Sequence, residues 1–416
     1  MSTSFQGLTV VIPTRNRSDL ARRAIQSARA QPGGALRVLV SDNSTEQTEI
    51  ERLQQFCAQL KDARLQYVRP PAPLAMSAHW DWAVQQALRS DSSHFTILTD
   101  RMVFKQGQLK TVVDIARQYP AQIICYMHDK VHDFAAPFTV EQYNWTGKLY
   151  EVTAARLLTL AAESVIYDAS TPRMLNCLVP RSVLTAIKER FGTIFASISP
   201  DWNFCYRALT VVDAILFFNK AVLVHYALNR SNGQSAERGI RNSDFEDFLK
   251  SLPQALNAAA PFPEIITVWN AIINEYCVTK RQAQSAKLPE LNMEKYVQAL
   301  AVGVSWIANP AVRREMEQKL LARGWQPTKA DNPSLIEKLL SPQRVLNKFK
   351  AMIGWPKSLV FETPEQALEY AINNFKPRSA ALPSDEAMHQ GREMPIRALA
   401  EQDAVADVAT AYSVAD

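Results

Sequence analysis

Three short polar segments of the sequence each follow an apolar run that is typical of a buried strand. Pro13–Arg17 follows LTVVI, Ser41–Ser44 follows LRVLV, and Thr99–Arg101 follows FTIL. Ligands of open parallel sheets bind outside the carboxyl ends of the strands, where such segments gather. Hydroxyl, carboxylate and guanidinium groups in one place predict a site for a charged ligand with many hydroxyl groups. For any single segment, satisfying the backbone of a turn or helix start is an equally good explanation.

The elements that would position these segments alternate regularly over the first hundred residues. Apolar strand-like runs are separated by amphipathic helix-like runs, which indicates βαβ units and a mostly parallel sheet covered on both faces. The predicted strands cover residues 8–12, 36–40, 65–68, 95–98 and 122–126. The predicted helices cover residues 18–30, 45–60, 74–89, 108–118, 152–162 and 181–190. Two short strands, 214–218 and 221–224, are predicted to meet at a turn.

The composition disfavours several classes of protein. The chain has 416 residues, of which 47% are hydrophobic, and a formal net charge of +5. A charge this small does not point to nucleic acid as a partner, although it suits anionic ligands. Five dispersed cysteines without CxxC spacing indicate reduced thiols rather than disulfides or a zinc site. The first strand lacks a glycine-rich loop after it, so dinucleotide-binding and P-loop folds are disfavoured.

The chain is predicted to divide into three parts. Residues 1–236 carry the α/β pattern, 237–376 form a helical C-terminal domain, and 377–416 form a flexible tail rich in Ala, Ser, Asp and Glu. The N-terminus lacks the pattern of a secretory signal, and no apolar run is long enough to span a bilayer, so we expect a cytoplasmic protein. The basic amphipathic segment 341–361 can either make peripheral contact with the inner face of the membrane or pack on the α/β domain.

Five stretches resemble, in order, the motifs of family 2 glycosyltransferases, which use nucleotide sugars and have the GT-A fold. They are TVVIPTRNR, VLVSDNST, MSAHWDWAVQQALRSDSSHFTILTD, SPDWNFCYRAL and VHYALNRSNGQS. The similarity covers about residues 7–236. It implies a GT-A-like, Rossmann-type α/β sandwich with a mostly parallel central sheet, followed by an α-helical C-terminal region.

On the nucleotide side, the resemblance implies a role for five residues. Pro13, Thr14 and Arg17 would line the nucleotide pocket. Asp42 would hydrogen-bond the base or the ribose. His79 stands where the family commonly has asparagine, and it would contact the nucleotide from there.

On the transfer side, the resemblance implies that Asp100 lies beside the diphosphate and donor sugar, Asp201 is the general base, and His225 lies near the diphosphate. A carboxylate can take the proton of the acceptor hydroxyl as its oxygen attacks the anomeric carbon. Attack from the side opposite the leaving group inverts that carbon. Mg²⁺ or Mn²⁺ usually neutralises the diphosphate. Alternatively, Asp201 is only a helix N-cap and His225 a core histidine.

The segment Thr99–Met102 departs from the family pattern, which has further acids after the first. Three interpretations stay open. Asp100 binds a metal with help from His225 and the donor phosphates; or Arg101 replaces the metal, because a guanidinium group suits phosphate geometry; or the site has lost transfer and keeps only binding. Met102 is no useful ligand for a hard cation.

The function that these observations favour is an inverting glycosyltransferase with a nucleoside diphosphate sugar as donor. The acceptor would be a glycan, a lipid-linked saccharide or a glycosylated protein. A catalytically silent nucleotide- or sugar-binding protein that serves as an assembly partner is the alternative. Trp145, Trp202 and Tyr206 are candidates for facing the acceptor sugar, with core packing as the default. His128 and His132 are spaced like a metal-binding pair on a helix.

Overall fold

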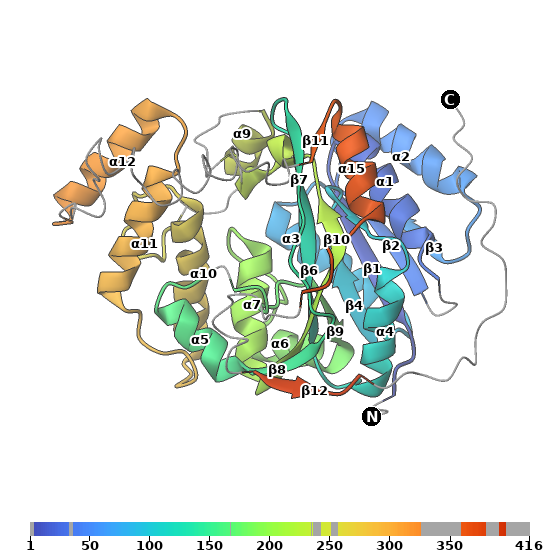
Figure 1. The fold of residues 1–416 in the computed structure, drawn as a ribbon, viewed down its shortest axis with the longest axis horizontal. Coiled ribbons are helices and arrows are strands. Elements are labelled where there is room, and N and C mark those ends of the chain that lie inside the picture. The colour runs from blue at the N-terminus through green and yellow to red at the C-terminus, as the bar shows by residue number, and fades with distance from the viewer. Residues whose placement is uncertain are drawn as a thin grey trace.

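The protein is an α/β structure in which one mixed sheet lies between two layers of helices (Figure 1). The computed structural model describes residues 4–32, 36–166, 168–233, 235, 243–250, 257–325, 359–379 and 391–396. The predicted fold class, with a mostly parallel central sheet followed by a helical region, is confirmed.

The sheet has the strand order β12-β8-β10-β6-β9-β4-β1-β2-β3, with β5 paired to β10, and β7 paired to β6 and β11. Strands β1 to β4 run parallel, as do β6 and β10, and the remaining strands join antiparallel. The strands are β1 Leu8–Thr14, β2 Leu36–Asp42, β3 Leu65–Val68, β4 His94–Ile97, β5 Met102–Phe104, β6 Ile124–His132, β7 Phe138–Glu141, β8 Leu149–Thr153, β9 Cys177–Pro180, β10 Ala214–His225, β11 Val360–Phe361 and β12 Arg392–Met394.

Helices cover both faces of this sheet (Figure 1). On one face lie α1, α2, α4 and α15, and on the other lie α3, α5, α6 and α7, with α10, α11 and α12 outside them. The helices are α1 Ser18–Arg29, α2 Gln47–Gln59, α3 Met76–Ala87, α4 Gln108–Gln118, α5 Ala154–Ala162, α6 Arg181–Phe191, α7 Pro200–Val211, α9 Ser243–Lys250, α10 Val268–Ala283, α11 Met293–Ser305, α12 Pro310–Ala322 and α15 Pro364–Asn373. A 3-10 helix, η1, spans Leu228–Arg230.

The central strands form because their sequences are apolar on both faces. Every residue of β1 is buried, and Arg37 is the one exposed residue of β2. Strands buried on both faces are what the βαβ pattern requires, since helices cover each side. Helix α6 ends at Gly192, whose φ of 79° lies in the left-handed region that glycine adopts without strain.

Two predictions from the sequence are wrong in detail. The strands predicted at 214–218 and 221–224 are one continuous strand, β10. Asn219 does not turn the chain; its buried side chain accepts hydrogen bonds from Thr146 N at 2.6 Å and Thr146 Oγ1 at 2.9 Å, and register shifts toward β6 absorb the irregularity. The segment with His128 and His132 is the strand β6 rather than a helix, so the helical metal pair does not form.

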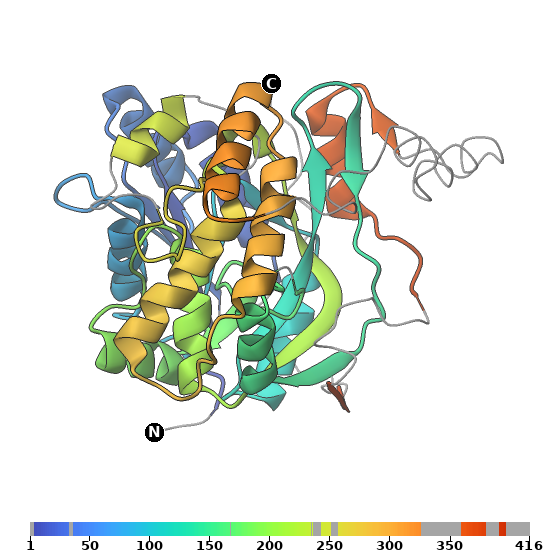
Figure 2. The ribbon, with the colours of Figure 1, turned by 90° about the vertical axis from the view of Figure 1, so that its left-hand side faces the viewer.

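The described segments of the C-terminal half lie in two different places. Helices α10, α11 and α12 lie side by side in front of the α/β part in Figure 2. The later segment returns to the sheet: α15 packs on β6, β7 and β10, and β12 pairs with β8. Most of the predicted membrane-contact segment 341–361 lies outside the described residues. Within the described part of the chain, no helix is both long enough and apolar enough to cross a membrane.

Candidate functional site

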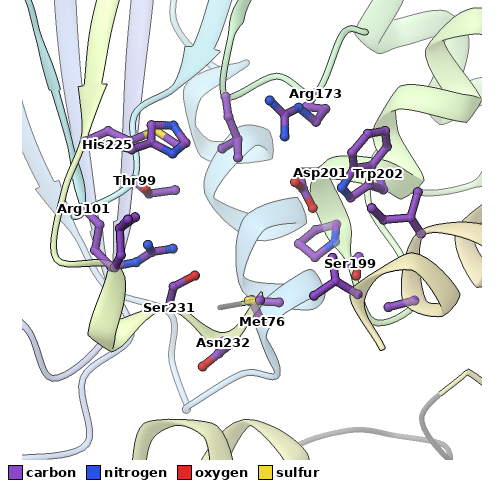
Figure 3. A pocket seen from close by; sticks show the side chains of 18 of the residues that line it. Met76, Thr99, Arg101, Arg173, Ser199, Asp201, Trp202, His225, Ser231 and Asn232 are labelled. Carbon is purple, nitrogen blue, oxygen red and sulfur yellow. The ribbon is translucent and has the colours of Figure 1, made fainter. Parts of the chain in front are cut away.

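A cavity of about 970 Å³ opens where the carboxyl ends of β1 and β4 face the start of α7 (Figure 3). Its two sides differ in origin, and we name them after the elements that dominate each. The strand-end wall consists of Pro13, Thr14, Arg17, Thr99, Asp100, Arg101 and His225. The helix wall consists of Arg173, Ser199, Asp201, Trp202, Ile266, Val268, Ile272 and Trp306. The structure therefore brings most of the predicted site residues to one cavity.

Asp100 is fixed in the strand-end wall by groups from β1 and the loop after it. The carboxylate is buried, and its Oδ2 accepts a hydrogen bond from Thr14 Oγ1 at 2.9 Å. Its Oδ1 lies 3.7 Å from Arg17 Nη1. Tyr226 also holds this turn, because its hydroxyl donates to the Asp100 carbonyl at 3.2 Å. The carboxylate is thus held by a hydroxyl and a cation of its own wall.

Arg101, the next residue, directs its side chain into the cavity (Figure 3). Its backbone carbonyl accepts a hydrogen bond from Tyr226 N at 3.1 Å, which ties the turn to the end of β10. Burial lowers the pKa of Arg101 to about 10, while Asp100 and Asp133 act in the opposite direction. The guanidinium group is therefore charged at neutral pH.

His225 is stacked on His128 within the same wall. The two rings are 4.0 Å apart between centroids and 13° from parallel. Burial lowers the pKa of both imidazoles well below the usual value, so both are neutral at physiological pH. The other groups of the His128 segment have partners of their own: Asp129 pairs with Lys105, and His132 lies 3.0 Å from Glu141.

Asp42 and His79, both predicted to contact a nucleotide, occupy different places. Asp42 is fully buried and is not part of the cavity lining; it accepts hydrogen bonds from Tyr67 OH at 2.7 Å and from Ser44 N at 2.8 Å. His79 lines the cavity from α3, and its Nε2 lies 2.8 Å from Ser41 Oγ. Burial lowers the pKa of His79 to about 3, so it is a neutral hydrogen-bonding group.

Asp201 lies in the first turn of α7, on the opposite side of the cavity from Arg101 (Figure 3). The side chain is partly exposed and faces the cavity. Burial raises its pKa, while Arg173 and the backbone N–H groups at the start of α7 oppose that rise. A carboxylate with a raised pKa and access to a cavity is suited to accept a proton.

The loop that carries Asp201 is held by Glu275, a residue that the sequence analysis did not identify. Glu275 is fully buried on α10, and its Oε1 accepts hydrogen bonds from Ile198 N and Ser199 N, each at 3.1 Å. Its Oε2 accepts one from Asn203 Nδ2 at 3.1 Å. A buried glutamate in a helix has no local sequence signal, because its partners lie about 75 residues away along the chain.

Arg173 is a second residue that the sequence analysis missed. Its guanidinium carbon lies 5.3 Å from the ring centroid of Trp202, within the range of a cation–π interaction. Figure 3 shows it beside Asp201 on the helix wall. It comes from the irregular segment before β9, where neither periodicity nor motif marks it. Of the three aromatic candidates, Trp202 lines the cavity, whereas Trp145 and Tyr206 do not.

The donor set of the strand-end wall does not fit a divalent metal ion. Mg²⁺ and Mn²⁺ prefer carboxylate, carbonyl and water oxygens. Here one carboxylate, Asp100, already accepts from Thr14 and faces Arg17, the next two residues are Arg101 and Met102, and His225 is stacked on His128. Among the described residues, no three His, Cys, Asp or Glu side chains form a group that could hold a metal ion.

The match to a known family covers residues 9–161, which fit the family model described as Glycosyl transferase family 2. A search of curated protein sequences gave no match. Solved structures of S. aureus TarS are weakly similar. One has a TM-score of 0.40 and 13% identity over 75% of this chain and 52% of that chain, so the present chain spans about half of it. TarS 1-349 in complex with UDP-GlcNAc gives 0.43 and 12% over 76% of this chain and 88% of that chain.

Proposed function

We propose that the protein is an inverting glycosyltransferase that uses a nucleoside diphosphate sugar; residues 9–161, which fit the model of glycosyl transferase family 2, support this proposal. The observation that carries this proposal is the opposition of Asp201 and the cationic strand-end wall across one cavity (Figure 3). Such a cavity can hold a donor with its diphosphate on one side and an acceptor hydroxyl near the base on the other.

In the proposed reaction, the carboxylate of Asp201 accepts the proton of the acceptor hydroxyl. The acceptor oxygen forms a bond to the anomeric carbon, and the bond from that carbon to the diphosphate oxygen breaks. The nucleoside diphosphate leaves with the electron pair, so no oxidant or reductant is needed. Because the new bond forms on the side opposite the leaving group, the anomeric carbon is inverted.

We assign the nucleotide and its diphosphate to the strand-end wall. Thr14 and Arg17 lie beside Asp100 there, and Pro13 closes the end of β1. Asp42 does not line the cavity. It accepts a hydrogen bond from Tyr67, which holds the end of β2 in place, and the next residue, Asn43, lines the cavity.

The helix wall is suited to the acceptor. Trp202, Ile266, Val268, Ile272 and Trp306 give it broad apolar surface next to Asp201. Flat apolar surface packs well against the C–H faces of sugar rings or against a hydrocarbon. A glycan, a lipid-linked saccharide and a glycosylated protein all remain within this proposal.

Thermal-shift screening against UDP-, GDP-, CMP- and dTDP-sugars, followed by a transfer and donor-hydrolysis assay with the stabilising donor, tests this function. We expect one nucleotide class to raise the melting temperature and to be consumed. The alternative, a binding protein without turnover, is favoured by one observation, the replacement of the acids at Arg101 and Met102. Binding without consumption, with wild type and Asp201→Asn indistinguishable, would establish that alternative. No binding to any nucleotide would overturn both.

A further inference from the structure

We propose that the guanidinium group of Arg101 does the work of a metal ion in this site, so that the protein transfers its sugar without a divalent cation. This inference rests on the proposed function and specifies how the leaving diphosphate is neutralised. It follows from the poor fit of the strand-end wall to a metal and from the placement of Arg101 in the same wall.

A single carboxylate, that of Asp100, lies in the turn that follows β4. A metal at Asp100 would bind a carboxylate that already accepts a hydrogen bond from Thr14 Oγ1, and it would lie next to Arg17, whose Nη1 is 3.7 Å from Oδ1. A cation at that distance repels a metal ion. The carboxylate therefore serves to orient the wall and to balance its arginines.

The next residue, Arg101, can offer its side chain to a ligand. Within the described part of the chain, its side chain makes no hydrogen bond or ion pair to a carboxylate, although Asp100 and Asp133 are near enough to stabilise its charge. The side chain points into the cavity (Figure 3). Its donors are thus available to a ligand. A guanidinium group offers parallel N–H donors that match two oxygens of a phosphate, and it stays charged when partly buried.

The backbone at Arg101 is held in place by hydrogen bonds. Tyr226 N donates to the Arg101 carbonyl at 3.1 Å, and Met102 N donates to the Thr99 carbonyl at 3.0 Å. Behind this turn, Val103 and Tyr226 pack in an apolar cluster with Ala367 and Leu368 of α15. A fixed donor placed where charge develops stabilises the transition state without reorganisation.

The chemistry balances without a metal. As the bond between the anomeric carbon and the diphosphate oxygen breaks, the electron pair goes to that oxygen, and hydrogen bonds from Arg101 stabilise its negative charge. The proton of the acceptor goes to Asp201 on the opposite wall. Lys130 and Arg17, which also line the cavity, add positive charge on the donor side.

The first experiment measures turnover of purified wild type with the donor found by screening, in excess chelator and with added Mg²⁺ or Mn²⁺. We expect turnover to agree within about twofold in all conditions, since in this inference the guanidinium group of Arg101, and not a metal ion, neutralises the diphosphate. Turnover that stops in chelator and returns with Mn²⁺ overturns the inference and leaves the proposed function intact.

The second experiment measures binding, so that it does not depend on turnover. We expect Arg101→Ala to weaken the affinity for the nucleoside diphosphate by about tenfold or more in chelator and to leave the affinity for the nucleoside unchanged. Arg101→Lys keeps the positive charge but loses the two parallel N–H donors of the guanidinium group, so it should retain part of the affinity. Arg37→Ala is the control, because that arginine pairs with Asp91 on the surface. Unchanged diphosphate affinity in a folded Arg101→Ala variant would contradict the inference.

Discussion

Two carboxylates that line the cavity from different walls, Asp100 and Asp201, differ in their surroundings. Asp100 is buried, and it accepts from a hydroxyl and faces a guanidinium group of its own wall. Asp201 is partly exposed, and burial raises its pKa against the influence of Arg173. The first has partners in the protein, and the second has room for a substrate hydroxyl. Equal side chains therefore suit different purposes: we propose that Asp100 orders a binding surface and that Asp201 takes part in the reaction.

Replacement of Asp201 by asparagine should have the largest effect on activity. Asparagine keeps the shape and the position at the start of α7 but cannot accept the proton of the acceptor. We expect turnover to fall by about 10²–10⁴-fold, the usual contribution of a general base. Steady-state kinetics of transfer measures the turnover. Calorimetry measures the affinity for nucleotide, which should not change.

The control for this substitution is Asp213→Asn, which removes an exposed carboxylate that pairs with Lys287. It should transfer sugar at the wild-type rate. If Asp201→Asn also keeps the wild-type rate, Asp201 is only a residue of the helix N-terminus and not the base. The different surroundings of Asp100 and Asp201 then do not reflect different roles in the reaction.

Glu275 tests whether the helix wall depends on being held in place. Glu275→Ala removes the acceptor of three hydrogen bonds to residues 198, 199 and 203. We expect the free energy of unfolding to fall by about 1–3 kcal/mol, because buried N–H groups lose their partner. Turnover should fall by about 10²-fold through misplacement of Asp201. Denaturant unfolding and kinetics measure both, and unchanged nucleotide affinity distinguishes a positioning role from general damage.

The pH dependence of stability gives a second test at Glu275. Burial raises the pKa of this carboxyl to about 7, above the value of 4.5 for the unfolded chain. The folded state therefore holds its proton to higher pH, and folding loses free energy as pH rises between these two values. Glu275→Gln, which cannot ionise, should lack this component. If the free energy of unfolding of wild type and of Glu275→Gln depends on pH in the same way, the raised pKa of Glu275 is contradicted.

Arg173 offers a smaller effect on the same wall. Its positive charge lowers the pKa of Asp201, so Arg173→Met should raise that pKa. Turnover requires the ionised carboxylate, and so the acidic limb of the pH–rate profile should move to higher pH. The rate at high pH should change less. If the pH–rate profile of Arg173→Met superimposes on that of wild type or moves to lower pH, Asp201 is not a base whose pKa is lowered by Arg173. Arg37→Met is the control, because it removes a positive charge elsewhere.

Sequence and structure agree best where a feature is local along the chain. The apolar run before Asp100 predicts a buried strand, and the end of that strand places Asp100 at the rim where Thr14 also ends β1. The position of Asp201 follows from a motif and a helix start. These features depend on neighbouring residues, which the sequence displays directly.

Features that depend on packing between distant elements could not be predicted. Glu275 reaches the Asp201 loop only because α10 packs on α7, and nothing near Glu275 in the sequence indicates that. Asp42 follows an apolar run just as Asp100 does, yet Tyr67 from the neighbouring strand takes its carboxylate. A polar side chain at a strand end can be buried only where neighbouring strands offer it hydrogen-bond partners, and these partners depend on the tertiary structure.

The smallest expected effect concerns the outer part of the helix wall. Trp306 is 48% exposed and lines the cavity, so Trp306→Ala should raise KM for the acceptor by about fivefold, equivalent to about 1 kcal/mol of packing. Because we assign the donor to the opposite wall, its KM and the affinity for nucleotide should stay constant. Leu321→Ala is a matched control, because Leu321 is equally exposed but does not line the cavity. If Trp306→Ala instead weakens nucleotide binding, the division of labour between the two walls is wrong, since the helix wall would then hold the donor.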